Sequence, residues 1–211
     1  MKFTNSLIKG KLLKRYKRFF ADIKVNNKII TAHCPNTGSM QGLLDEGNEV
    51  LVTEHNDPKR KLKFTLEIIK AKKRYVGVNT HRANKIVNHG LENKLISEFK
   101  TIKNIKPEFK FSDDTRFDFL CDNYLIEVKN VTLFRENDLA EFPDAVTSRG
   151  TKHLNMLIKS IKKGYKPHVL FLTQIQNINN FRIAKDIDQI YFENYKKAKK
   201  AGVKFLAYRC K

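Results

Sequence analysis

The spacing of apolar residues changes near residue 80, and no other feature constrains the fold of this 211-residue chain as strongly. Before that point, apolar and polar residues alternate over short runs that turn residues separate, which is the period of a β-strand. After it, apolar residues first recur at steps of about four, as on one face of a helix. We therefore expect a β-rich domain over residues 1–80 and a mixed α/β domain over residues 81–211.

The first of these regions holds five runs with the alternation and the aromatic or β-branched content of strands. They are RYKRFFADIKV, KIITAHC, NEVLVTEH, KLKFTLEIIKA and RYVGVNT. The stretches NNK and NDPKRK supply turn residues between neighbouring runs. Five short strands in so short a region predict a small barrel or a strongly bent sheet.

The second region reads as a helix, three strands, a helix, a strand, a helix and a strand. The first helix is expected over HRANKIVNHGLENKLISEF, where Leu91, Leu95 and Phe99 are spaced by four. FKF, RFDFL and NYLIEVKNV are the strand candidates. The stretch SRGTKHLNMLIKSIKKG predicts a second helix, with Ser148 as its cap and Gly164 at its end.

The last third of the chain completes this order. HVLFLTQI is almost entirely apolar, as expected of a central strand that is covered on both faces. DIDQIYFENYKKAKKAG and VKFLAY follow as a helix and a strand. The whole pattern predicts a mixed α+β protein, with a barrel-like domain before an α/β domain.

The chain carries 42 Lys and Arg against 22 Asp and Glu, for a formal net charge of +20. Such a charge attracts polyanions, and the release of counterions gives affinity that does not depend on base sequence. DNA is therefore the expected partner, and RNA is also open. The alternative is a composition bias, since abundant Asn, Lys and Ile also follow from an AT-rich genome. No helix-turn-helix signature points to a sequence-specific repressor.

Cysteine and apolar content indicate the compartment. Cys34, Cys121 and Cys210 are far apart and form no CxxC pair, which favours a reducing cytoplasm over a disulfide framework or a zinc site. The start, MKFTNSLIKGKLLKRY, lacks the apolar core of a signal peptide, and no run approaches the roughly 20 apolar residues of a membrane span. We expect a soluble cytoplasmic protein with no membrane partner. The oligomeric state has no signal in the sequence.

The stretch TRFDFLCDNYLIEVKNVTL places charged residues inside two core-like strands. Because side chains alternate along a strand, Glu127 and Lys129 share one face. The short CDNY connection allows a hairpin that brings Asp118 beside Glu127. Two nearby carboxylates repel each other, and a divalent cation such as Mg²⁺ or Mn²⁺ relieves that repulsion. Lys129 could then polarise a metal-bound water or stabilise phosphate charge.

The spacing of these residues matches the PD-(D/E)xK nuclease pattern. Eight residues separate Asp118 from Glu127, and one residue separates Glu127 from Lys129. The alternative is a surface cluster of Asp, Glu and Lys on an amphipathic hairpin. Glu98, on the first expected helix, is the candidate for a further carboxylate near the metal, and a solvated helix face is the alternative for it.

The chain also resembles the sugar fermentation stimulation protein family. The resemblance rests on RYKRFFADI (15–23), HCPNTGSMQGL (33–43), VGVNTHRAN (76–84), RFDFL (116–120), IEVKNVTL (126–133), FPDAVTSRGTKHL (142–154) and AGV (201–203). It implies an OB-fold-like β-barrel followed by a restriction-endonuclease-like domain, nonspecific DNA binding and a link to the regulation of sugar (maltose) metabolism. One departure is DIDQIYF, where the family more often has Asp-Pro.

A second candidate group lies in FPDAVTSRGTKHL. In a nuclease-like fold the helix that begins here flanks the metal site, so Arg149 and Lys152 are candidates to grip phosphates. Lys152 and His153 are also candidates for the catalytic group. The alternatives are a packed, hydrogen-bonded His153 and an Asp144 that only caps a turn.

The N-terminal domain has its own candidates for contact with nucleic acid. Six basic residues occupy the ten positions 9–18, and aromatic residues lie among them. OB-type sheets bind strands by backbone charge and aromatic stacking, so the candidates are Arg15, Tyr16, Lys17, Arg18 and Phe19. The alternative is a solvated basic strand.

Two further stretches carry open alternatives. PNTGSM is either an anion-binding turn around Gly38 or a purely structural loop. Asn79, Arg82 and Asn84 either line a cleft between the domains, with Arg82 contacting nucleic acid, or tie the domains together.

These features lead to a DNA-binding protein with a metal-dependent, nuclease-like site. The first alternative is a noncatalytic DNA-binding regulator that retains the fold. The second is a metal-dependent enzyme for a small phosphorylated or nucleotide substrate, which makes less use of the +20 charge.

Overall fold

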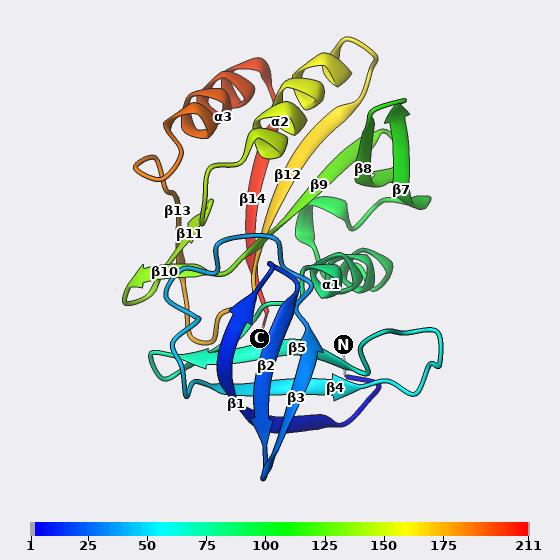
Figure 1. The fold of residues 1–211 in the computed structure, drawn as a ribbon. Helices are drawn as coiled ribbons and strands as arrows, with labels where there is room; N and C mark the ends of the chain where they lie inside the picture. The colour runs from blue at the N-terminus through cyan, green and yellow to red at the C-terminus, as the bar shows by residue number, and fades with distance from the viewer. Residues whose placement is uncertain (1–2, 211) are drawn as a thin grey trace.

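The structure is a computed structural model, and it describes residues 3–210. Its first strands form one sheet in the order β3-β2-β1-β4-β5-β6, and a parallel pairing between β3 and β5 closes the first five strands into a barrel (Figure 1). The predicted small barrel is confirmed. The strands are β1 Leu7–Tyr16, β2 Phe20–Val25, β3 Lys28–His33, β4 Glu49–Glu54, β5 Phe64–Ala71 and β6 Arg74–Gly77.

The first expected strand is in fact a hairpin. Lys17 and Arg18 have φ angles of 46° and 63°, the left-handed values of a tight turn between β1 and β2. Phe19 follows in the same turn and is 44% exposed. The expectation of one strand over RYKRFFADIKV was wrong, because this turn uses Lys and Arg where Gly or Asn would have marked it.

The second part of the chain is an α/β layer structure. Its main sheet has the order β14-β12-β9-β8-β7, with α1 against one face and α2 and α3 against the other (Figure 1). This confirms the expected order of helices and strands. The elements are α1 Thr80–Glu92, β7 Ile105–Ser112, β8 Thr115–Cys121, β9 Tyr124–Val131, α2 Ser148–Ile161, β12 Lys166–Thr173, α3 Gln189–Ala201 and β14 Lys204–Arg209.

β12 lies inside the sheet, between β9 and β14, and pairs in parallel with both. Seven of its eight residues are buried, as the apolar run HVLFLTQI predicted. Alternate residues of this strand face opposite cores. Val169 and Phe171 belong to the core under α2 and α3, whereas Leu170 and Leu172 belong to the core under α1.

A small second sheet was not predicted. It has the order β10-β11-β13, with β10 Leu133–Glu136, β11 Leu139–Phe142 and β13 Asn180–Ile183. Its strands are short and charged. The buried Glu141 carboxylate accepts hydrogen bonds from Arg135 at 2.6 Å and Arg182 at 2.8 Å. The Arg182–Glu141 pair joins residues 41 positions apart in the sequence, so periodicity does not reveal it.

The first helix ends earlier than its apolar spacing suggested. Asn93 caps it, and Lys94 takes a left-handed φ of 55°. Leu95 is consequently 65% exposed and does not continue the apolar stripe, while Phe99 is buried in a separate 3-10 helix, η1 Ser97–Phe99. The expectation of one helix as far as Phe99 was wrong at its end.

The barrel and the α/β layers share one core. A single cluster of buried apolar residues contains Leu12 and Val52 from the barrel together with Leu154 and Tyr191 from α2 and α3. The apolar contact between the two parts is therefore continuous. Within residues 3–210, no helix is both long and apolar enough to cross a bilayer.

Candidate active site

Asp118 and Glu127 lie where two paired strands separate. β8 and β9 pair from Cys121↔Tyr124 to Phe119↔Ile126, and the ladder ends there. The next position in that register sets Asp118 opposite Glu127. The Asp118 carboxylate instead accepts a hydrogen bond from the Val128 backbone N–H at 2.7 Å. A side chain thus takes the bond that a ladder partner would otherwise make, and the two acids lie just past the end of the β8–β9 ladder.

Glu127 is buried between a lysine and a histidine. Its Oε1 atom accepts from Lys129 Nζ at 2.6 Å and lies 2.5 Å from His153 Nδ1. Burial raises the pKa of Glu127, but the neighbouring Lys129 charge and the His153 hydrogen bond outweigh it, so the pKa lies below its ordinary value. Glu127 is therefore ionised at neutral pH. Lys129 shares its strand face, as the alternation predicted.

Asp118 has the opposite character. Its Oδ1 atom accepts from Asn84 Nδ2 at 2.6 Å, and Asn84 reaches it from α1. Burial first, and then the charge of Glu127, raise the pKa of Asp118 to about 7. Two neighbouring carboxylates thus have pKa values that their surroundings push apart, which is typical of functional sites.

The two acids provide a donor set that suits a small divalent cation. Mg²⁺ is commonly held by one or two carboxylates and completes its shell with water. Within residues 3–210 no hydrogen bond occupies Glu127 Oε2, so this oxygen is available. The same residues contain no group of three or more His, Cys, Asp or Glu that could hold a metal.

Glu98 does not join this pair. It lies in η1, is exposed, and accepts hydrogen bonds from Ser97 and from Tyr208 of β14. The expectation that Glu98 would be a third metal ligand is not supported, because the chain turns away after α1 and directs this carboxylate to the end of β14. The alternative, a solvated face of the first helix, agrees with the exposure of Glu98 but not with its element, because α1 ends at Glu92.

α2 places its residues on opposite sides. It begins with Thr147 as the cap, not Ser148, because Thr147 Oγ1 accepts from Gly150 N at 3.1 Å. His153 points inward to Glu127, whereas Lys152 points outward and pairs with Asp114 at 2.7 Å. Lys152 therefore has no contact with the acid pair, and the expectation that it belongs to the catalytic group is not supported. Arg149 is exposed in the first turn.

The PNTGSM loop does bind an anion, and the anion is a side chain of the same protein. Met40 N donates to Asp144 Oδ2 at 2.9 Å, and Ser39 Oγ donates to the Asp144 carbonyl oxygen. A Cβ atom at Gly38 would lie 2.6 Å from Asp144 Oδ2, so only glycine allows this approach. The loop fastens the barrel to the segment that leads into α2.

The candidates on the barrel divide into two groups. Arg15 and Tyr16 are engaged within the protein. Arg15 donates to the Asn36 carbonyl oxygen at 2.7 Å, and the Tyr16 hydroxyl donates to Asp22 at 3.2 Å. The other group consists of the three exposed turn residues Lys17, Arg18 and Phe19. This basic turn remains a candidate for contact with nucleic acid.

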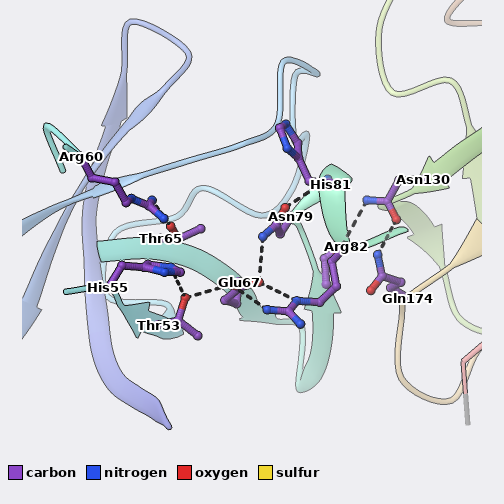
Figure 2. Close-up of polar contacts among 11 residues, drawn as sticks. Thr53, His55, Arg60, Thr65, Glu67, Asn79, His81, Arg82, Asn130 and Gln174 are labelled. Carbon is purple, nitrogen blue, oxygen red and sulfur yellow. Dashed lines mark hydrogen bonds and ion pairs between the residues drawn. The ribbon is translucent and has the colours of Figure 1, made fainter. Parts of the chain in front are cut away.

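Figure 2 shows a polar network that joins the barrel to α1. Glu67 of β5 is buried and accepts two bonds of 2.9 Å from the Arg82 guanidinium. Asn79 and Thr53 each donate a further bond of 2.9 Å. Burial raises the pKa of Glu67, but the bonds from Arg82 and Asn79 outweigh it and hold the pKa below its ordinary value.

This network decides between the two expectations for the junction. Arg82 donates two bonds to Glu67 and packs on the ring of Phe3, so it ties the domains together and is not a free phosphate ligand. Asn84 has a different role, since it reaches Asp118. Sequence reasoning had placed Asn84 only at the domain junction and had not assigned it to the site. The sequence feature that could have pointed to Asn84 is its position in VNTHRAN, one turn of α1 beyond the domain junction.

Two family models match the chain. "SfsA N-terminal OB domain" matches residues 13–78, and "Sugar fermentation stimulation protein RE domain" matches residues 81–211. The first match, together with the closed sheet, confirms the expected OB-type barrel.

Relatives extend over the whole chain. The "Sugar fermentation stimulation protein homolog" of Pelagibacter ubique is 65% identical and covers 100% of this chain and 93% of the relative. The homolog of Alteromonas mediterranea is 44% identical with the same coverage. The solved structure of Pyrococcus furiosus SfsA superposes with a TM-score of 0.90 at 24% identity, over 99% of this chain and 90% of that one, which shows a common fold. The chain therefore belongs to the sugar fermentation stimulation protein family.

Proposed function

We propose that this protein binds nucleic acid, primarily DNA, with little dependence on sequence, and hydrolyses phosphodiester bonds with Mg²⁺ or Mn²⁺ held by Asp118 and Glu127. The observation that carries the proposal is the position of these two acids at the separation of β8 and β9, with Lys129 on the same strand face. A hairpin that served only packing would have no use for two neighbouring carboxylates, because burial and then the charge of Glu127 make ionisation of Asp118 unfavourable and raise its pKa.

The chemistry of the donors supports a divalent cation. A cation between the two carboxylates would offset both the burial of Asp118 and its repulsion by Glu127. The Pyrococcus furiosus relative was solved in complex with Ca²⁺, which like Mg²⁺ takes oxygen ligands. When bound, such a cation supplies Lewis acidity towards water and phosphate oxygens.

The side chains of the protein then have separate tasks. Asn84 and the Val128 N–H hold the Asp118 carboxylate in place through bonds to both of its oxygens. His153 fixes one oxygen of Glu127 and leaves the other free. Lys129 holds a positive charge beside the acids, where it stabilises the charge that grows on the phosphate in the transition state.

Binding is supported by the charge of the molecule and by the barrel. The net charge of +20 favours long anionic chains over small anions, because affinity grows with each phosphate that is neutralised. OB-type barrels bind oligonucleotides, through backbone charge and through base stacking on aromatic residues. The exposed turn of Lys17, Arg18 and Phe19 offers both kinds of contact on the barrel.

A noncatalytic nucleic-acid-binding regulator is the second candidate. The net charge favours it, since charge supports binding without any chemistry. This candidate predicts the same salt-dependent binding but no cleavage with any cation. The two candidates therefore differ in one measurable property.

The test is to incubate the purified protein with single-stranded, duplex and branched DNA and with RNA, each with Mg²⁺, Mn²⁺ or EDTA. We expect cleavage that needs the cation and is lost in Asp118→Asn. Asp45→Asn removes one exposed carboxylate of the barrel and serves as the matched control with full activity. If the wild type cleaves none of these substrates, or Asp118→Asn cleaves them equally well, the catalytic proposal is rejected and the regulator remains.

A further inference from the structure

A polar hollow of about 400 Å³ is lined in part by His153, whose Nδ1 atom lies 2.5 Å from Glu127 Oε1. The turn between β7 and β8 forms one wall, and the first two turns of α2 form the other. Nine residues line it, namely Lys110, Ser112, Asp113, Asp114, Thr115, Arg116, Arg149, Lys152 and His153. The hollow thus joins an open surface to the residue that positions Glu127.

The charges in the hollow are unequal. Its four basic side chains meet only two acids, and each acid has one lysine partner. Lys110 pairs with Asp113 at 2.8 Å, and Lys152 pairs with Asp114 at 2.7 Å. Within the described residues, 3–210, no carboxylate lies within 4.0 Å of a nitrogen of Arg116 or Arg149. The two guanidinium groups are therefore available to an external anion.

The Asp114 carboxylate binds Lys152 at the place where an external anion would bind it. This carboxylate also accepts hydrogen bonds from Ser112 Oγ and Thr115 Oγ1, so the turn itself holds it in place. The hydrogen bond from Lys152 and those two hydroxyl groups lower the pKa of Asp114 to about 2, so it is negative at any physiological pH. An incoming phosphate must compete with this carboxylate for Lys152.

We propose that this hollow is a phosphate subsite for the nucleic-acid backbone, in which Arg116 and Arg149 bind a phosphate and Asp114 acts as a built-in competitor for Lys152. The subsite rests on the proposed function, because it assigns a second backbone contact to the same substrate. The phosphate that it holds would be a neighbour of the one at the acid pair, since His153 both lines the hollow and contacts Glu127.

The chemistry of the hollow favours a backbone phosphate over other anions. Guanidinium groups bind phosphate through paired N–H donors, and two of them from different elements fix a phosphate in one orientation. Arg149 also lies in the first turn of α2, where the helix dipole favours a negative charge. The hollow is open, which a chain that continues in both directions requires.

The experiment measures binding in EDTA, so that cleavage does not interfere. A fluorescently labelled oligonucleotide, single-stranded or duplex, is titrated with protein between 50 and 200 mM salt. The wild type is compared with Arg116→Ala/Arg149→Ala and with Lys197→Ala/Lys200→Ala, which removes the same charge from the exposed side of α3. Two lost phosphate contacts lower the log–log salt slope by about 1.8 for duplex DNA or about 1.4 for single strands. The α3 variant should retain most of the wild-type slope.

Asp114→Asn tests the competitor directly. Removing its charge frees Lys152, and affinity for the oligonucleotide should rise about 2- to 5-fold, the range that one exposed ion pair covers. Asp45→Asn changes the net charge equally and should leave affinity near that of the wild type. A thermal melt of each variant confirms that it is folded.

The outcomes are distinct. If the wild type binds no oligonucleotide, the proposed function and the subsite both fail. If the wild type binds but the arginine variant behaves like the α3 variant, or Asp114→Asn binds no tighter than Asp45→Asn, the subsite is rejected while the proposed function stands. A separate titration with inorganic phosphate decides the source of the ligand. Tight binding of phosphate that oligonucleotides do not compete with would assign the hollow to small phosphate esters and overturn the proposal.

Discussion

In the absence of metal, replacing Asp118 by Asn should stabilise the protein at neutral pH. The reason is the acid pair itself. Burial and the Glu127 charge raise the pKa of Asp118 from 3.8 to about 7 in the folded protein, so ionising this carboxyl group opposes folding. Asparagine has nearly the same shape, can still accept the Val128 N–H bond, and carries no charge.

The size of this stabilisation and the pH range over which it develops follow from the pKa of Asp118 in the unfolded chain and in the folded protein. Below pH 3.8 the carboxyl group is protonated in both states and has no effect. Between that value and about 7 the unfolded chain loses the proton and the folded protein keeps it, so the free energy of unfolding falls as pH rises. Each pH unit in this range costs about 1.4 kcal/mol, giving a total loss of about 4 kcal/mol above pH 7. For a chain of this size that corresponds to about 8–16 °C in the midpoint of melting.

The assay is urea unfolding in EDTA at pH 5, 6, 7 and 8, for the wild type and Asp118→Asn. The difference in unfolding free energy between the two proteins should grow with pH and favour the variant. Adding Mn²⁺ at pH 8 should stabilise the wild type and leave the variant almost unchanged. If the difference in unfolding free energy is the same at pH 5 and pH 8, ionisation of Asp118 does not destabilise the folded protein, and the reasoning about the acid pair is wrong.

Three further predictions follow from other parts of the structure. Replacing Glu67 by Gln should lower the free energy of unfolding by about 3–5 kcal/mol in denaturant titrations, because it leaves the partly buried guanidinium of Arg82 without its charged partner. Gly38→Ala should lower it by about 1–3 kcal/mol, since the new methyl group meets the Asp144 carboxylate; a midpoint unchanged from wild type would show that the loop is not fixed there. Lys129→Ala should keep oligonucleotide affinity within a few-fold but reduce cleavage about 10²-fold or more, and equal losses of both would assign Lys129 to binding instead.

Local patterns predicted the elements of the fold well. The barrel strands alternate and are bounded by turn residues, so each is visible in its own short window. β12 is apolar along almost its whole length because both of its faces are covered. The acid pair was also predictable, because only a short turn separates β8 from β9 and the alternation of side chains fixes which residues share a face.

Features that depend on distant parts of the chain were not predictable. Asn84 meets Asp118 across 34 positions, and Asp144 meets Met40 across 104. Neither contact produces a periodic pattern in the sequence from which it could be predicted. The β1–β2 turn was missed for a local reason, because Lys17 and Arg18 take left-handed conformations that Gly or Asn usually signal.

The sequence also did not show which side chains of α2 point toward the acid pair. Lys152 and His153 are adjacent in sequence, and both were expected in the catalytic group. On a helix, neighbouring residues point about 100° apart, so only one of them can face Glu127. The structure gives that place to His153 and leaves Lys152 with Asp114.

The most direct test of the central claim is the binding of Mn²⁺ to the metal-free protein, measured by calorimetry at pH 7.5 without nucleic acid. The wild type should bind one ion at the acid pair, and Asp118→Asn/Glu127→Gln should bind none there. Glu98→Gln, which changes a carboxylate that lies away from the pair, should bind as the wild type does. Undiminished binding in the double variant would place the metal elsewhere and contradict the account.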